Sequence, residues 1–554
     1  MPNPNPHANH PRPFHLFLPL CLTLATSLTL PPPASACTNF IASKGATTDG
    51  SVIVTYTCDG EFHPLLRLTP AADHQPGDVF QVTTWGDQVL GEVAQPPHTY
   101  AVMKLMNENQ VTIGETTTGG REELINPDGL LPYWHLMGLT LQRAESARHA
   151  IQIMGQLMDE YGYRSSGESF AIGDPEEAWI MEVVGPGPGG QGAHWVALRV
   201  PDGYVSAYAN MGRIGTFDPR DKKNCLTSGP GMIRFAQEQG WYDPADGPFN
   251  WREAFHPADP QRLRYTATRV WSLFRRCGVE LPADYHRGTA GAEPYPLWIK
   301  PEKKLDVADV FALMRDHYEG TEFDMTRGVD AGPYGNPSRW RPMGFELDGH
   351  SYTWERPIST QQTGFSMVTQ SRSWLPDPIG GVTWYGLDDT WFTCYVPLYC
   401  GQDAVPPSYA RGSLGRFSWD SAWWTFNFVS NFAALKYRYM SPDIQAVQDE
   451  LEGHLLALQP AVEMTAKKLA KEDPQLMRAY LTDYSVQHAE DVVRKWRDLG
   501  EYLITTYNDG YVKDADGRVT EKGYPESWLR AVIRAHPDKY RLPDVQDLEE
   551  PADY

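Results

Sequence analysis

The stretch ASACTNFIASKG, residues 34–45, joins an apolar leader to the first strand-like segment of the chain. Residues 16–30 are an apolar run, and residues 31–36 are Pro-rich and small, ending in A-x-A. Arg12 is the single charged residue before Lys44, so these parts match a secretory signal peptide. The run is shorter than the ~20 residues that span a bilayer. We therefore predict a signal peptide over residues 1–36, with Cys37 as the first residue of the mature chain.

Cleavage after Ala36 would give Cys37 a free α-amino group beside its thiol. The unperturbed pKa values, ~8.5 for the thiol and ~7.7–8.0 for the amine, let the amine accept the thiol proton near neutral pH. The thiolate would attack a carbonyl carbon and form an acyl-enzyme, which water then hydrolyses. This pattern predicts a hydrolase with an N-terminal nucleophile.

Two other readings of Cys37 stay open from the sequence. The letters ASAC also resemble a lipobox, in which the cysteine is lipidated on its thiol and acylated on its amine, and either modification would abolish the chemistry. A lipobox prefers a large aliphatic residue where this chain has Ala34. A plain structural cysteine is the third reading. We favour the free cysteine, and a secreted or periplasmic location over a lipid anchor at the cell surface.

The composition is that of a globular, acidic protein. Hydrophobic residues make up 41% of the chain and aromatic residues 12%, and the formal net charge is −22. Nucleic-acid binding needs clustered Lys and Arg, so we expect no nucleic-acid partner. No later stretch is apolar enough for an integral membrane span. The sequence leaves a homo-oligomer open.

Cysteines and histidines give no metal motif. The chain has seven cysteines, and Cys394 and Cys400 are close enough to form a small disulfide loop, although connectivity cannot be read from sequence. There is no C-x-x-C pair and no H-E-x-x-H sequence, so we expect neither a metal nor a cofactor.

Hydrophobic periodicity predicts hairpins and helices in alternating blocks. Residues 38–43 and 51–57 form a hairpin pattern, and a second hairpin is expected from 99–106 and 110–116. Helical periodicity covers 147–158, with Ser146 as N-cap, and continues over 307–318 and from 443 onward. Strands are expected at 365–370, 381–387 and 392–396. This order suits an α+β fold with stacked sheets and outer helices. We expect a catalytic domain at 37–440, a helical region at 441–536 packed on it, and an acidic tail at 537–554.

Four segments carry a resemblance to a known family. They are CTNFI at 37–41 with DGS at 49–51, YVSAYAN at 204–210, RDHYEGT at 315–321, and SWLP at 373–376 with GGVTW at 380–384. From Cys37 to about Asp509 the chain resembles the PepD-type dipeptidases, which are secernin-related cysteine hydrolases of the Ntn-hydrolase superfamily. It looks more distantly like the penicillin V acylase and bile salt hydrolase group.

The resemblance implies an αββα four-layer sandwich that hydrolyses dipeptides without a metal. The chain would then carry a C-terminal helical extension and act on a dipeptide or another small amide. Two alternatives remain: an N-acyl amide hydrolase of the penicillin V acylase or bile salt hydrolase type, and a lipidated, non-catalytic surface protein.

The resemblance also implies roles for four residues. Cys37 matches the nucleophile, and Asp59 matches an Asp that orients the N-terminal residue. Asn107 is expected to donate to the oxyanion, and Asn210 to position the α-amino group and the substrate. Without the resemblance, Asn107 would be read as a turn residue, because Asn tolerates left-handed backbone geometry, and Asp59 as the end of a strand.

One position departs from the family pattern. Relatives often have Arg three residues before the equivalent of Asp59, where this chain has Tyr56. An Arg there would lower the thiol pKa, whereas Tyr56 can only form hydrogen bonds. Arg264 or Arg269 is a candidate for the missing cation.

Overall fold

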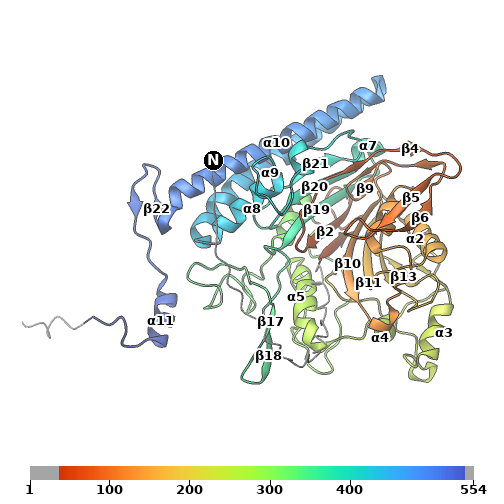
Figure 1. Ribbon diagram of the computed structural model, residues 1–554, viewed down its shortest axis with the longest axis horizontal. Coiled ribbons are helices and arrows are strands. Elements are labelled where there is room, and N and C mark those ends of the chain that lie inside the picture. Colours follow the sequence, from red (N-terminus) through yellow and green to blue (C-terminus); the bar gives the residue numbers. More distant parts are fainter. Residues whose placement is uncertain (1–36, 543–554) are drawn as a thin grey trace, which may run out of the picture. The chain divides into compact units, whose positions relative to one another are not determined.

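The computed structural model describes residues 37–542, and the predicted signal peptide and the end of the acidic tail lie outside them. Within this range the chain is mixed α and β, with two large antiparallel sheets and several helices (Figure 1). The predicted α+β class is therefore confirmed. Among the described helices, none has both the length and the apolar character needed to cross a membrane.

The first sheet contains the hairpin that follows Cys37. β1 (Asn39–Ala42) pairs antiparallel with β2 (Val52–Asp59), with Ile41 opposite Val54, as the alternating β-branched residues predict. The seven strands lie in the order β16 (Trp298–Ile299), β14 (Val205–Tyr208), β1, β2, β19 (Thr363–Ser371), β20 (Val382–Leu387) and β21 (Val396–Tyr399).

The second sheet contains the predicted hairpin at 99–116, but in broken form. The chain turns sharply at Lys104 and Gln110, whose φ angles are 56° and 62°, so the first half becomes several two-residue strands. The eight strands lie in the order β15 (Cys225–Thr227), β13 (His194–Arg199), β12 (Ala178–Val184), β11 (Gly167–Gly173), β10 (Thr112–Gly119), β9 (Met106–Asn107), β8 (Val102–Met103) and β3 (Leu68–Thr69).

The two sheets pack face to face around an aliphatic core. Ile41 and Val54 from the first sheet share a buried cluster with Ala171 and Ile180 from the second. Gly114 lets the backbones approach closely, because a Cβ on it would lie 2.6 Å from the side-chain nitrogen of Asn39. This close approach brings β10 against the start of β1, where Cys37 lies.

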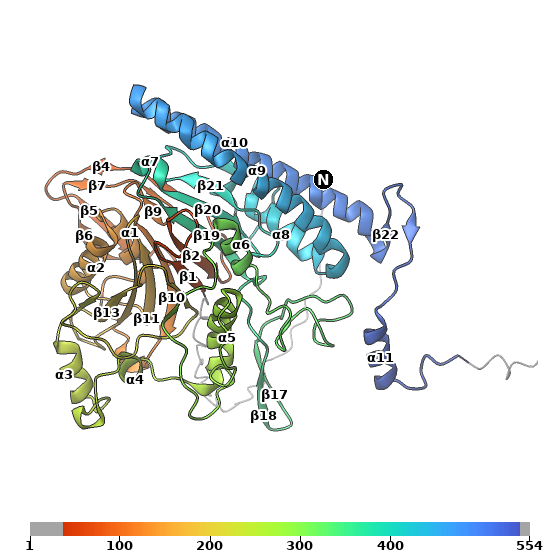
Figure 2. The same ribbon diagram turned by 180° about the vertical axis from the view of Figure 1, so that it is seen from behind.

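Helices cover the outer face of each sheet (Figure 2). α1 (Tyr133–Leu141) and α2 (Ala147–Tyr161) pack on the second sheet, and Ser146 caps α2 by accepting from the amide of His149, as predicted. α5 (Pro260–Arg276) and α6 (Val307–Met314) pack on the first sheet. This arrangement places helices, two sheets and helices in succession, while the assignment to the Ntn-hydrolase superfamily stays a prediction.

The C-terminal helices lie beside the first sheet. α8 (Ala422–Ala433), α9 (Tyr437–Glu472) and α10 (Pro474–Tyr507) pack on each other, and α10 also contacts β21. Two ion pairs connect α9 to the core: Arg315 with Glu452, and Arg372 with Glu463, each at 2.5 Å.

The remaining elements are short helices and two-stranded hairpins. They are α3 (Gly231–Glu238), α4 (Trp251–Phe255), α7 (Asp377–Gly380), α11 (Glu526–Ala535), β4 (Ala72–Asp73) with β7 (His98–Thr99), β5 (Val79–Thr83) with β6 (Val89–Ala94), β17 (Gly344–Leu347) with β18 (His350–Thr353), and β22 (Val512–Lys513) with β23 (Val519–Thr520).

Several local expectations need correction. The helix expected over 307–318 ends at Met314, and Tyr318 has a φ of 67°, which no helix residue adopts. The strand expected over 392–396 instead begins at Val396. Cys394 and Cys400 are both free thiols rather than a disulfide pair.

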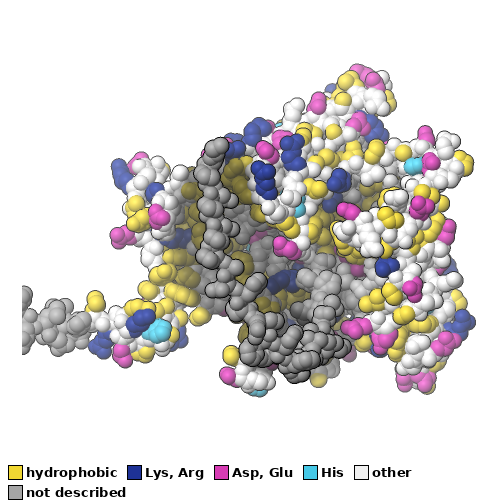
Figure 3. All heavy atoms as spheres, viewed as in Figure 1, with side chains coloured by type: hydrophobic (Ala, Val, Ile, Leu, Met, Phe, Trp, Pro, Cys, Tyr) yellow, Lys and Arg dark blue, Asp and Glu magenta, His cyan; other side chains and the backbone are white. Residues whose placement is uncertain are grey.

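The described part of the surface carries both signs of charge. On the face drawn in Figure 3, Lys and Arg side chains are interspersed with Asp and Glu among apolar and neutral groups.

Candidate functional site

Cys37 lies directly before β1 and is completely buried. Its Sγ atom is 3.6 Å from Oε1 of Glu115 on β10 and 3.9 Å from the hydroxyl oxygen of Tyr56 on β2. The hydroxyl of Tyr56 donates a short hydrogen bond to the same Glu115 oxygen. The candidate nucleophile therefore faces a tyrosine–carboxylate pair formed by both sheets.

This environment keeps the thiol protonated. Burial raises the pKa of Cys37 well above its ordinary value, and a hydrogen bond with Cys58 and the charge of Glu115 raise it further. In the full chain the nitrogen of Cys37 is a peptide nitrogen, which cannot accept a proton. Ionisation of the thiol needs a base, and this nitrogen cannot act as one before cleavage.

Arg269, from the middle of α5, holds the backbone around Cys37. Its Nη1 donates to the carbonyl oxygen of Cys37 and to the hydroxyl of Thr38, both at 2.8 Å. Thr116 of β10 also donates to the carbonyl of Cys37, at 3.1 Å. Of the two arginines suggested by the sequence, Arg269 reaches the candidate site, whereas Arg264 pairs with Glu355 at the surface.

Asp59 ends β2 in a buried ion pair. Its carboxylate accepts from Arg356 at 2.6 Å and from the hydroxyl of Thr363 at 2.7 Å. Burial raises the pKa of Asp59, and Arg356 and Thr363 oppose that rise. Asp59 therefore belongs to the group of buried polar side chains behind Cys37.

Asn210 connects these groups. Its φ of 56° lies in the left-handed region, which Asn tolerates better than most residues. The side-chain oxygen accepts from Arg269 at 2.9 Å and from Arg356 at 3.4 Å, and the backbone amide donates to Thr116 at 3.0 Å. The structure thus brings Cys37, Asp59 and Asn210 together through two arginines and one threonine.

Asn107 lies in a different environment. Its side-chain nitrogen donates to the carbonyls of Leu141 and Ala144, at 2.8 and 2.7 Å, and its oxygen accepts from the amide of Val111. Both amide hydrogens are therefore engaged in fixing the end of α1 against the β9–β10 turn. These bonds leave no donor for an oxyanion, so the geometry favours the turn interpretation of Asn107.

Sequence reasoning missed the carboxylates of the site. Glu115 and Glu168, on the adjacent strands β10 and β11, are fully buried and lie close to each other, and burial raises the pKa of both. Thr117 donates to Glu168 at 3.1 Å. The signal available from the sequence was a glutamate, Glu115, inside the strand expected at 110–116.

Lys104 is a buried cation beside an aromatic ring. Burial lowers the pKa of Lys104 to about 8, and its ammonium lies 3.9 Å from the centre of the Phe365 ring.

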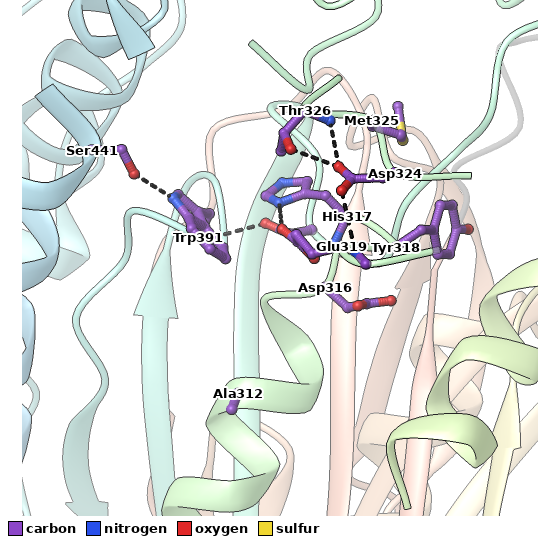
Figure 4. Close-up of polar contacts among 12 residues, drawn as sticks. Ala312, Asp316, His317, Tyr318, Glu319, Asp324, Met325, Thr326, Trp391 and Ser441 are labelled. Carbon is purple, nitrogen blue, oxygen red and sulfur yellow. Dashed lines mark hydrogen bonds and ion pairs between the residues drawn. The ribbon is translucent and has the colours of Figure 1, made fainter. Parts of the chain in front are cut away.

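The RDHYEGT segment forms a second polar cluster, at the end of α6 (Figure 4). The His317 ring points to Glu319, with Nδ1 3.0 Å from its carboxylate, and packs edge-on against Trp391. Asp316 accepts from Ser272 at 2.6 Å and pairs with Arg276 at 3.0 Å. The indole nitrogen of Trp391 donates to Ser441 of α9 at 2.9 Å. These contacts join α5, the segment after α6 and the C-terminal helices.

Comparison with known proteins identifies the family. The model of peptidase family C69 matches residues 36–450, and its match begins beside Cys37. The chain belongs to peptidase family C69. The matched region ends at residue 450, inside α9, so the rest of α9 and all of α10 and α11 lie beyond it.

Curated relatives align over most of the chain. A probable dipeptidase of Salmonella dublin is 28% identical over 403 residues, which cover 69% of this chain and 84% of the relative. A probable dipeptidase of Latilactobacillus sakei is 24% identical, with 79% and 90% covered. A dipeptidase of Bifidobacterium longum is 25% identical, with 81% and 84% covered.

Proposed function

We propose that the protein is an exported cysteine dipeptidase whose nucleophile is Cys37 after removal of residues 1–36. The observation that carries the proposal is the position of the thiol, which faces Tyr56 and Glu115 while Arg269 and Thr116 hold its carbonyl. The names of the relatives and membership of family C69 support the dipeptide as substrate.

In the proposed reaction, the freed α-amino group of Cys37 takes the thiol proton. The thiolate attacks the scissile carbonyl carbon, the peptide C–N bond breaks, and the amine of the second residue leaves with a proton. Water, deprotonated by the same α-amino group, then hydrolyses the thioester and releases the first residue. Tyr56 stays neutral, because burial raises its pKa, and its hydroxyl donates to the Glu115 carboxylate that lies 3.6 Å from the sulfur.

The polar groups around Cys37 carry charges of both signs. Arg269 and Arg356 supply two positive charges and Asp59 one negative charge, while the carboxyl of Glu115 lies 3.6 Å from the sulfur. Arg269 holds the carbonyl of Cys37 at 2.8 Å, so it fixes the backbone next to the nitrogen that cleavage would free. We infer that Arg269 positions the α-amino group of mature Cys37 beside its own thiol.

An N-acyl amide hydrolase is the alternative enzyme, and substrate panels separate the two. Mature protein is assayed on dipeptides and on fatty-acyl and bile-acyl amides, together with Cys37→Ala and Cys37→Ser. We expect hydrolysis of dipeptides by the wild type, none by the Ala variant, and at most a trace by the Ser variant. Normal turnover by Cys37→Ala would refute the nucleophile, and activity on acyl amides alone would refute the dipeptidase.

A further inference from the structure

We propose that Glu115 and Glu168 form the subsite that binds the free α-ammonium group of the dipeptide. The inference rests on the proposed dipeptidase function and adds to it the group that recognises the amino end of the substrate. Its basis is a pair of buried carboxylates that the chain itself leaves incompletely partnered.

The two carboxylates are placed by strand register. Thr117 of β10 lies opposite Glu168 of β11, and Glu115 is two residues before Thr117 on the same face of the strand. The hydrogen bonds of Tyr56 and Thr117 reach one oxygen of each carboxylate. The two carboxyl groups also hydrogen-bond to each other, and their buried Oε2 atoms accept no hydrogen bond from any other described residue.

Such a pair needs a positive charge or a shared proton. Both side chains are at most 1% exposed, and two buried like charges in contact disfavour each other's ionisation. Within residues 37–542, neither forms an ion pair with Lys, Arg or His, although 24 other ion pairs link acidic groups to such cations in this range. Without substrate the two carboxyls hydrogen-bond to each other through a shared proton. A bound ammonium group would take the place of that proton, which would leave to solvent, and would supply one positive charge and three donors to the oxygens.

The position relative to Cys37 fits the amino end of a dipeptide. In a dipeptide a single carbon atom separates the α-nitrogen from the scissile carbonyl carbon. A group that binds this nitrogen must therefore lie within a few ångströms of the attacking sulfur, and Oε1 of Glu115 is 3.6 Å from Sγ. An N-acylated substrate has no charge at this nitrogen, so the same carboxylates would disfavour it.

The test uses Glu168→Gln, because Glu168 hydrogen-bonds to Thr117, whereas Glu115 contacts the sulfur of Cys37 itself. Mature wild type, Glu168→Gln and the exposed control Glu92→Gln are assayed on one dipeptide and on its N-acetyl derivative. A hydrogen bond to a charged group is worth enough to change binding about 10- to 100-fold. We expect Glu168→Gln to raise KM for the free dipeptide by about that factor, with a smaller change in kcat.

The ratio of kcat/KM for the free dipeptide to kcat/KM for its N-acetyl derivative decides the outcome. The wild type and Glu92→Gln should prefer the free dipeptide strongly, and Glu168→Gln should lose most of that preference. An unchanged preference in a folded Glu168→Gln variant would overturn the subsite while leaving the dipeptidase intact. If the wild type hydrolyses no dipeptide at all, the proposed function itself fails, and the subsite fails with it.

Discussion

At the scale of the residue, Tyr56 is one of the two side chains that face the thiol of Cys37. Its hydroxyl lies 3.9 Å from the sulfur and donates to Glu115, whose carboxylate oxygen lies 3.6 Å from the same sulfur. The sequence indicated that Tyr56 could only form hydrogen bonds, and the structure provides the partners. Tyr56 thus orients groups around the thiol and cannot lower the thiol pKa by charge.

We expect Tyr56→Phe to lower kcat/KM about tenfold or more, because it removes the hydrogen bond that holds the Glu115 carboxylate beside the sulfur. Tyr385→Phe is the matched control, since the Tyr385 hydroxyl is buried without a hydrogen-bond partner among the described residues. Steady-state kinetics on a dipeptide measures both variants. Equal activity of Tyr56→Phe and wild type would remove Tyr56 from the mechanism.

The two arginines considered from the sequence provide a second comparison. Arg269→Met removes the shorter of two hydrogen bonds to the carbonyl of Cys37 and to the side-chain oxygen of Asn210, which leaves Thr116 and Arg356 as donors. Both activity and unfolding temperature should therefore fall. Arg264→Met removes a partly exposed ion pair and should change stability by less than about 1 kcal/mol. Thermal unfolding and activity assays measure both, and an equal response of the two variants would contradict the assignment.

At the scale of the element, the segment after α6 illustrates what periodicity cannot predict. The apolar spacing of residues 307–318 is helical throughout, yet the chain leaves the helix after Met314. The buried Asp316 pairs with Arg276 and accepts from Ser272, both on α5, and these contacts outweigh local propensity there. Tertiary partners of this kind are not visible in a single sequence.

The His317–Glu319 pair should make stability depend on pH. Burial alone would raise the pKa of Glu319, but its bonds with His317 lower it to about 2, and Glu319 in turn raises the pKa of His317. The contribution of Glu319 is present above its unfolded pKa of about 4.3 and is lost as pH falls toward about 2. The contribution of protonated His317 to stability is present below its unfolded pKa of about 6.5. It is lost as the pH rises through the raised pKa of His317 in the folded protein.

Glu319→Gln should therefore lower the unfolding temperature most between about pH 4.3 and about pH 6.5. The difference from wild type should shrink in stronger acid and in alkali. The exposed Glu322→Gln, which loses a surface pair with Arg287, is the control and should differ little from wild type at any pH. A Glu319→Gln difference that stays constant with pH would show that the pair does not control stability.

At the scale of the whole molecule, hairpin and helix patterns predicted the α+β class and the first hairpin, because those signals are local. The order of strands in the sheets and the convergence of Glu115, Arg356 and Asn210 could not be predicted from the same patterns. They depend on contacts between β10, β2 and segments more than a hundred residues away. Asn107 shows the converse, since its local turn chemistry indicated its place better than the resemblance did.

The C-terminal helices should differ in importance to folding. α10 buries Leu481 and Trp496 against the core, whereas α11 has no buried residue. Removal of residues 526–554 should leave unfolding temperature and activity close to those of the full chain. Removal of residues 474–554 should give an aggregating protein, because it exposes the apolar surface of α8, α9 and β21. Thermal unfolding and gel filtration measure both, and a stable shorter product would contradict the role of α10.

The state of Cys37 in active protein tests the central claim most directly. Protein exported by its host is purified with its activity followed on a dipeptide, and its N-terminal peptide is analysed by mass spectrometry. We predict that the active protein begins at Cys37, with an unmodified amine and an unmodified thiol. Full activity in protein that begins at another residue, or whose Cys37 is acylated, would contradict the account.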